Sequence, residues 1–188
     1  MKNSYLTTAA AALLAMGIAG CGSGSSSGGT GTLDVGLTDA PAAFDAVYVT
    51  VERVAVHRAD DGNDSNESNA SWITVAEPHG TYDLLTLQNG TTEALGVATI
   101  PAADYTQMRL YLSSESNDTA LYPYGNYVVI GSVPYELTVP SMVIKETHNF
   151  VMAADGNMTM TIDFDANASI HAASDKWILN PVLHIDTH

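Results

Sequence analysis

The stretch Ala46-Val-Tyr-Val-Thr-Val-Glu-Arg-Val-Ala-Val-His57 decides the fold of this chain. Its valines alternate with other residues, and a period of two is typical of a β-strand that buries one face. The first three valines share one parity, whereas Val54 and Val56 have the other. A β-bulge near Glu52-Arg53 would bring all five valines to the core side, because one extra residue restores the alternation. We therefore expect a long, bulged strand here.

The same alternation recurs along the chain in short runs separated by turn residues. Tyr105–Leu112 and the run Met158–Asp165 each place methionine and other large apolar residues on one face. Further strands are expected at Thr32–Leu37, Ser71–Val75, Thr99–Pro101, Tyr127–Ile130, Tyr135–Val139, His148–Ala153 and Trp177–Ile185. No long stretch has helical spacing, although Tyr82–Leu87 can form a turn of helix. Many short strands without intervening helices predict an all-β fold, a two-sheet antiparallel β-sandwich of immunoglobulin-like or transthyretin-like type, with a closed β-barrel as the alternative.

The first residues have the plan of a lipoprotein signal peptide. Lys2 precedes an apolar stretch from Ala9 to Ile18, which is shorter than the roughly 20 apolar residues of a membrane span. The run closes on Ile18-Ala19-Gly20-Cys21, which resembles the bacterial lipobox. We expect residues 1–20 to be removed and Cys21 to carry lipid, which would anchor the protein to a membrane. Gly22, rather than an aspartate, follows the cysteine; by resemblance to Gram-negative lipoproteins this favours the outer membrane of the cell envelope.

Composition divides the remaining chain and limits its partners. Residues 21–31, the cysteine and a run of Gly, Ser and Thr, are expected to act as a flexible tether, and residues 32–188 as a single β-sandwich domain. The chain has 6 Lys and Arg against 21 Asp and Glu, a net charge of −15. Such a charge argues against nucleic acid or anionic lipid surfaces as partners. Residues 59–70 are too polar to be buried and are expected to connect two strands.

Several short motifs together resemble one family. They are Leu37-Thr38-Asp39-Ala40-Pro41, Val47-Tyr48-Val49-Thr50, Tyr82-Asp83-Leu84-Leu85, Tyr105-Thr106-Gln107-Met108-Arg109-Leu110, Val139-Pro140-Ser141, Asp163-Phe164-Asp165-Ala166 and Leu179-Asn180-Pro181-Val182. Their order is similar to that in the bacterial and archaeal lipoprotein domain catalogued as domain of unknown function 4382, from about Thr32 to Ile185. The resemblance implies an exported, β-rich domain on a lipid anchor, and it implies no activity.

Carboxylates offer the clearest candidate for a metal site. Asp163 and Asp165 stand two apart on an expected strand, so both project from one face. They could share a Ca²⁺ ion with a third carboxylate, Asp39 or Asp83. The alternative is that one carboxylate accepts backbone N–H groups at the strand end and the other is solvated. No other cofactor is expected, because the six histidines lack transition-metal spacing.

Aromatic residues gather in one segment. Tyr122, Tyr124, Tyr127 and Tyr135 flank two prolines, a composition suited to a recognition surface for a protein or glycan, or to an irregular hairpin that covers the sandwich edge. Arg109, one of few cations, is expected to pair with a carboxylate such as Asp163 or Asp83.

The sequence favours a lipid-anchored cell-envelope protein with a binding or adhesion domain rather than an enzyme. A structural, Ca²⁺-stabilised envelope component is the second interpretation, and an extracytoplasmic hydrolase is the third. No nucleophile motif supports the hydrolase, since the sequence has no Gly-x-Ser-x-Gly and its single cysteine, Cys21, would carry lipid.

Overall fold

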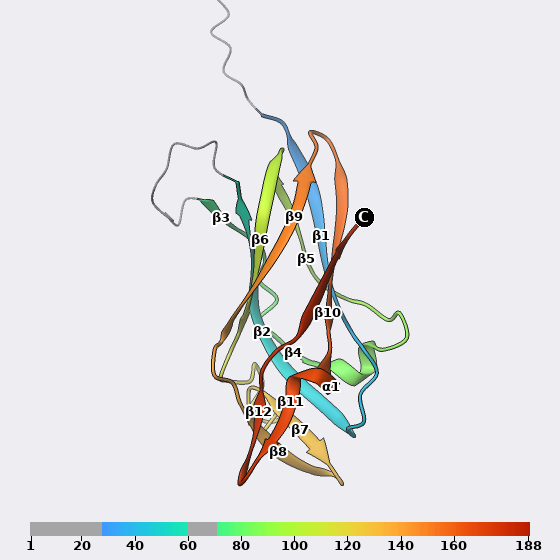
Figure 1. The fold of residues 1–188 in the computed structure, drawn as a ribbon, viewed down its shortest axis with the longest axis vertical. Helices are drawn as coiled ribbons and strands as arrows, with labels where there is room; N and C mark the ends of the chain where they lie inside the picture. The colour runs from blue at the N-terminus through green and yellow to red at the C-terminus, as the bar shows by residue number, and fades with distance from the viewer. Residues whose placement is uncertain (1–27, 60–70) are drawn as a thin grey trace, which may run out of the picture.

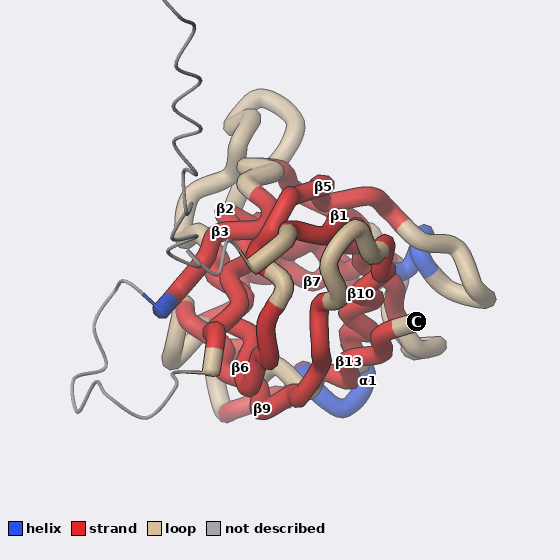
Figure 2. Tube along the Cα trace, turned by 90° about the horizontal axis from the view of Figure 1, so that it is seen from above, coloured by secondary structure: helices blue, strands red, loops and turns tan. Residues whose placement is uncertain are grey.

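A computed structural model describes residues 28–59 and 71–188, which form two packed β-sheets (Figure 1). The smaller sheet has the strand order β13-β10-β1-β5. The larger sheet has the order β11-β12-β8-β7-β2-β6-β9, with β3 and β4 also paired to β2. The sheets face each other without closing into a barrel, as Figure 2 shows from above. The expected two-sheet β-sandwich is therefore confirmed, and the barrel alternative is wrong.

Element bounds follow chain order. The strands are β1 (Thr30–Asp39), β2 (Ala46–Arg58), β3 (Trp72–Ala76), β4 (Gly80–Asp83), β5 (Glu93–Pro101), β6 (Ala103–Leu112), β7 (Tyr127–Ile130), β8 (Val133–Thr138), β9 (Val143–Met152), β10 (Asn157–Phe164), β11 (Ile170–Ala173), β12 (Lys176–Leu179) and β13 (Leu183–Thr187). A 3₁₀ helix, η2 (Leu84–Leu87), and a one-turn helix, α1 (Ala166–Ser169), complete them. The single strand expected over Trp177–Ile185 is instead two strands, which belong to different sheets.

The long strand β2 organises the larger sheet. Its valines Val47, Val49, Val51, Val54 and Val56 are all fully buried. The register with β6 shifts between Val51 and Arg53, so the predicted bulge is present and lies at Glu52. Each buried valine contributes about 1.5–3 kcal/mol relative to an exposed one, which is why the bulge is preferable to exposing two of them.

Two strand pairs run parallel, so the sheets are mixed rather than purely antiparallel. β1 and β10 are parallel over eight registered pairs, from Thr32 with Asn157 to Asp39 with Phe164. β12 and β8 are also parallel. Alternation alone could not indicate this, because the side-chain period is two in either direction. The core between the sheets includes Leu33, Leu37, Met108, Met160 and Phe164, each fully buried.

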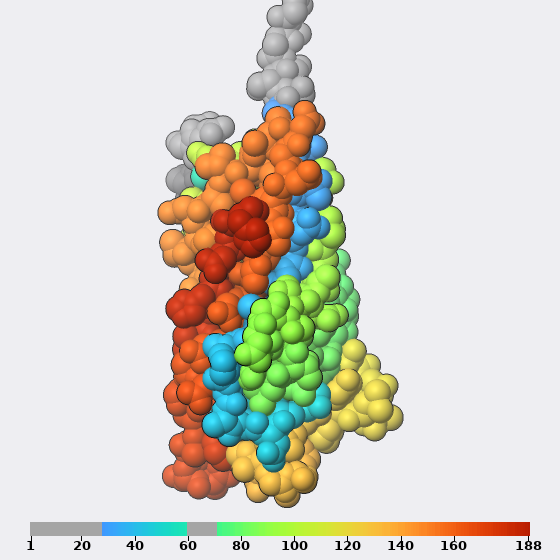
Figure 3. All heavy atoms as spheres, turned by 90° about the vertical axis from the view of Figure 1, so that its right-hand side faces the viewer, coloured from blue at the N-terminus to red at the C-terminus, as the bar shows by residue number. Residues whose placement is uncertain are grey.

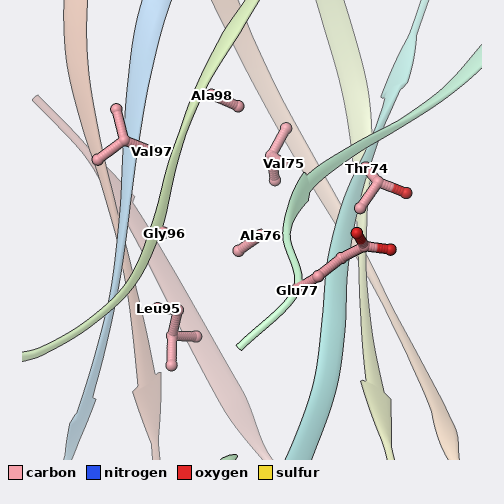
Figure 4. A pocket seen from close by; sticks show the side chains of 8 residues that line it. All are labelled: Thr74, Val75, Ala76, Glu77, Leu95, Gly96, Val97 and Ala98. Atoms are coloured by element: carbon pink, nitrogen blue, oxygen red, sulfur yellow. The ribbon is translucent and has the colours of Figure 1, made fainter. Parts of the chain in front are cut away.

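The two sheets come close together where the edge strands β3 and β5 meet. A Cβ atom at Gly96 of β5 would lie 2.9 Å from the Cβ atom of Ala76 in β3. Beside this contact is a groove of about 360 Å³ (Figure 4), whose only charged lining residue is Glu77. Glycine at position 96 is what allows the two backbones to approach.

Candidate functional site

Three tyrosines that the sequence indicated lie together on the outer surface of the larger sheet, and a fourth joins them. Tyr127 of β7 is opposite Tyr48 of β2, and their rings stack with centroids 4.5 Å apart. The ring of Tyr122 lies 5.5 Å from that of Tyr48, and the ring of Tyr124 lies 6.3 Å from that of Tyr127. We call these four residues the tyrosine cluster. The sequence did not indicate Tyr48 as a site residue, because the alternation around it predicts only a strand.

Exposure divides the roles within the tyrosine cluster. Tyr127 is only 4% exposed, whereas Tyr124 is 37% exposed and Tyr122 is half-buried. Burial raises the pKa of Tyr127 far above its ordinary value, and neighbouring Tyr48 adds to the rise. Burial also raises the pKa of Tyr48, which is hydrogen-bonded to Asp83. Tyr127 therefore supports the cluster from within. Tyr124 is the ring that a ligand reaches most easily, and Tyr122 and Tyr48 are both half-buried beside it.

Tyr135 lies apart from the cluster. Its residue is in register with Val128, the neighbour of Tyr127, so its side chain projects from the opposite face of the sheet. Its ring lies 6.4 Å from the ring of Trp177, and the residue is 41% exposed. The structure therefore does not bring the four predicted tyrosines into one surface.

The connection between β6 and β7 carries two of the tyrosines, and a buried asparagine fixes it. Along β2, β7 pairs with Ala46–Tyr48 and β6 pairs from Val51 onward, which leaves Val49 and Thr50 between them. Asn126 fills this gap: its Oδ1 accepts a hydrogen bond from Thr50 N (3.2 Å), and its Nδ2 donates one to Ser113 O (2.7 Å). The connection (yellow) projects from the lower part of the molecule in Figure 3.

A polar pocket of about 210 Å³ adjoins the tyrosine cluster. Its lining residues are Thr50, Glu52, His79, Ser113, Glu115, Ser116 and Asn117. The bulge at Glu52 turns that carboxylate outward. Thr81 Oγ1 connects the floor to the wall, since it lies 2.7 Å from Thr50 Oγ1 and donates to Asn117 Oδ1 at 2.7 Å. Ser116 Oγ donates to Tyr122 O (3.1 Å), which joins the pocket to the cluster.

The backbone at the pocket is strained at one residue. His79 has φ of 45°, in the left-handed region that residues with a side chain seldom adopt. Such strain costs about 1–3 kcal/mol and is concentrated at functional sites. The sequence could not reveal this pocket, because its residues come from β2 and from two connections that lie far apart in the chain.

Three of the four predicted metal-ligating carboxylates bond backbone N–H groups instead. Asp83 Oδ1 accepts from Leu85 N (3.1 Å) at the start of η2, and Asp165 Oδ1 accepts from Ala168 N (2.7 Å) at the start of α1. Asp39 is 4% exposed; its Oδ1 accepts from Ala166 N (3.0 Å). Asp163, on the neighbouring strand, has a buried Oδ1 atom without a hydrogen-bond partner. Within residues 28–59 and 71–188, no group of three or more acidic, His or Cys side chains is arranged to hold a metal ion.

Asp39 nonetheless has unusual electrostatics. Its pKa is raised from 3.8 to about 6, mainly by burial and in smaller part by the charges of Asp163 and Asp165. The hydrogen bonds from Ala166 N and from Gln88 Nε2 (3.4 Å) act in the opposite direction. Asp39 therefore connects the ends of β1, η2 and α1 through hydrogen bonds, and its ionised form lowers the stability of the folded protein.

The two partners named for Arg109 in the sequence analysis are wrong. Among the described residues it forms no ion pair with Asp163 or Asp83; its guanidinium lies 3.8 Å from the ring centroid of Trp72. Cys21 falls outside the described residues, so its lipidation stays a prediction. No helix in the described part of the chain is long and apolar enough to cross a membrane.

Comparison with known proteins gives one match. The family described as "Domain of unknown function (DUF4382)" matches residues 30–181, which spans β1 to the residues just before β13. No match was found among curated proteins or among solved structures. The matched region contains both the tyrosine cluster and the polar pocket. The chain therefore belongs to the DUF4382 family.

Proposed function

We propose that this chain is a lipid-anchored cell-envelope protein whose β-sandwich binds a glycan at the tyrosine cluster and the polar pocket. The observation that carries the proposal is their adjacency. Exposed aromatic rings stack on sugar faces, and a neighbouring wall of carboxylate, amide and hydroxyl groups offers hydrogen bonds to sugar hydroxyls. The pocket volume of about 210 Å³ suits one sugar unit rather than a folded partner.

The binding proposal is tested with the full-length protein in a neutral detergent. Maltohexaose, cellohexaose and chitohexaose are titrated while saturation-transfer NMR and tyrosine fluorescence are recorded. The double variant Tyr122→Ala/Tyr124→Ala should weaken binding by tenfold or more, since stacking contributes roughly 0.5–1.5 kcal/mol per ring beyond its buried area. Tyr135→Ala is the matched control, because it removes an equally exposed tyrosine from another surface. Equal losses in both variants, or no binding of any probe, would refute the assignment.

A second candidate is glycoside hydrolysis, which is favoured by one observation. Glu52 and Glu115 line the same pocket, and paired carboxylates are the usual machinery of glycosidases. The assay measures the release of reducing ends from the same oligosaccharides. Release by the natural protein that is lost in both Glu52→Gln and Glu115→Gln would show that the site is catalytic rather than a binding site alone. Without such release, the carboxylates act as hydrogen-bond acceptors for the ligand.

The anchor is tested separately. Cys21→Ser should leave a precursor that is unprocessed or soluble, because no other lipid attachment site is expected. Partitioning into a detergent phase measures this outcome. A variant that enters the detergent phase as the natural protein does would show that Cys21 is not the anchor. We further propose that the anchored protein lies in the outer membrane.

A further inference from the structure

Cations gather on one outer surface of this acidic molecule. The strands β3, β2, β6 and β9 lie side by side in the larger sheet (Figure 1). Arg53 of β2, Arg109 of β6 and Lys145 of β9 project from the face opposite the core, because their neighbours Val54, Leu110 and Ile144 are buried. The whole chain has only 6 Lys and Arg in a net charge of −15. Three of them therefore share a surface three strands wide.

Aromatic rings hold the two guanidinium groups flat against the sheet. Arg53 lies 3.9 Å from the ring centroid of Tyr111, which is opposite it on β6. Arg109 crosses β2 to reach Trp72, which is in register with His57. The residue of β2 directly opposite Arg109 is Ala55, whose small side chain leaves room for this crossing. The basic face is defined as Arg53, Arg109, Lys145, His57, Trp72 and Tyr111; the imidazole of His57 lies 4.8 Å from the Trp72 ring.

Charge on the basic face is not compensated within it. Arg109 and Lys145 are directly opposite each other on β6 and β9, an arrangement of like charges that destabilises a sheet. The other outward positions in register on these strands are Ala55, Thr74, Gln107, Val143 and Thr147, and none is acidic. The described carboxylate next to the face is Glu52, which the bulge beside Arg53 turns outward. Glu146 follows Lys145 but is in register with buried Met108, so it projects from the other face. A ligand that supplies negative charge would relieve the repulsion.

Stacking on rings explains where the arginines lie, but it does not explain Lys145. A lysine opposite an arginine gains nothing from the rings and adds repulsion, so a structural role alone does not account for the set. A site that conflicts with local stability is the expected signature of binding. Guanidinium groups that are already ordered by cation–π contacts would lose little further entropy on pairing with carboxylates.

The arrangement of the cations indicates the kind of anion. They span three adjacent strands, a width of roughly 10 Å at about 4.8 Å per strand. Charges this far apart on an open surface can contact successive acidic groups of a polymer, but not one small anion at once. Nucleic acid is disfavoured, because a duplex carries one charge per roughly 1.7 Å, a density that three cations spread over roughly 10 Å do not match. A polymer with one carboxylate on each sugar is less densely charged, and its pyranose rings can contact Trp72 and Tyr111.

We propose that the basic face is a second binding surface, which takes an acidic polysaccharide of uronic acids. The inference does not depend on the polar pocket, whose carboxylates Glu52 and Glu115 would disfavour the same ligand. It also does not depend on lipidation. The two surfaces lie along the same strand, β2, with the bulge at Glu52 separating them.

The test uses the full-length protein in neutral detergent and polygalacturonate as the probe, with binding measured by calorimetry at several salt concentrations. The triple variant Arg53→Gln/Arg109→Gln/Lys145→Gln should weaken binding by at least tenfold and flatten its salt dependence, since fewer counterions are released. The control Arg58→Gln/Lys176→Gln removes the two other described cations and should change binding less than twofold. Circular dichroism and thermal melts establish that both variants are folded.

Other results would contradict the role proposed for the basic face. Equal weakening in the control, or equal binding to uncharged dextran, would overturn the proposal by showing that the basic face is not recognised. Tighter binding to vesicles of phosphatidylglycerol than to polygalacturonate, lost in the triple variant, would overturn it in favour of a membrane contact. Absence of binding by the natural protein at low salt would also refute the proposal.

Discussion

Replacement of Asp39 by asparagine should change the pH dependence of stability. The carboxyl is 4% exposed, and its pKa rises from 3.8 to about 6 on folding. Between these values the folded state holds the proton that the unfolded state has lost. The free energy of unfolding contributed by Asp39 therefore falls as pH rises from about 4 to 6, and it is constant above that range.

The magnitude follows from the size of the rise. One pKa unit corresponds to 1.36 kcal/mol, so ionised Asp39 costs the folded protein roughly 3 kcal/mol at most at neutral pH. In Asp39→Asn, the amide Oδ1 can still accept from Ala166 N, and Gln88 can rotate its amide to accept from the new Nδ2. The variant should therefore match the natural protein near pH 4 and exceed it by about 2–3 kcal/mol at pH 7.

Urea denaturation followed by tryptophan fluorescence at pH 4, 5, 6, 7 and 8 and constant ionic strength measures this difference. Asp34→Asn is the control, because it removes one charge from an exposed position of the same strand. A stability difference for Asp39→Asn that is independent of pH would refute the reasoning. High salt should shrink the difference, because Asp163 and Asp165 contribute part of the pKa rise through their charges.

Three other perturbations test the fold and the metal hypothesis. Asn126→Ala should lower the free energy of unfolding by about 1–3 kcal/mol for each backbone group left unpaired, Thr50 N and Ser113 O. A loss below about 0.5 kcal/mol in urea denaturation would contradict the role given to Asn126. Gly96→Val should destabilise the folded protein by about 1–3 kcal/mol, because the new Cβ would lie 2.9 Å from the Cβ atom of Ala76. The control Val97→Ala, at an exposed position, should have little effect on stability. Equal effects of the two variants would show that β3 and β5 can move apart. Ca²⁺ and Na⁺ at matched ionic strength should raise the melting temperature equally, since Asp83 and Asp165 already bond backbone N–H groups; a Ca²⁺-specific increment lost in Asp163→Asn/Asp165→Asn would restore the calcium site.

The sequence by itself determined the local structure of this protein. The valine alternation in Ala46–His57 predicted a strand, and its change of parity predicted the bulge that the register with β6 places at Glu52. The run ending at Asp165 predicted four apolar side chains facing inward, and Met160, Ile162 and Phe164 are fully buried. These predictions succeed because burial acts on a residue according to its parity, and parity can be read from neighbours along the chain.

Only the tertiary structure decided what is brought together across the chain. Alternation does not encode strand direction, so it could not reveal the parallel pairing of β1 with β10. It also could not bring Tyr48 next to Tyr122, or Arg109 over Trp72 in place of a carboxylate. The sequence indicated Asp39 only as a candidate calcium ligand, whereas its burial at the meeting point of three elements, with two nearby carboxylates, raises its pKa to about 6. The physical reason is common to all of these: pairing partners, desolvation and electrostatic fields depend on distances in space, and residues far apart in sequence set them.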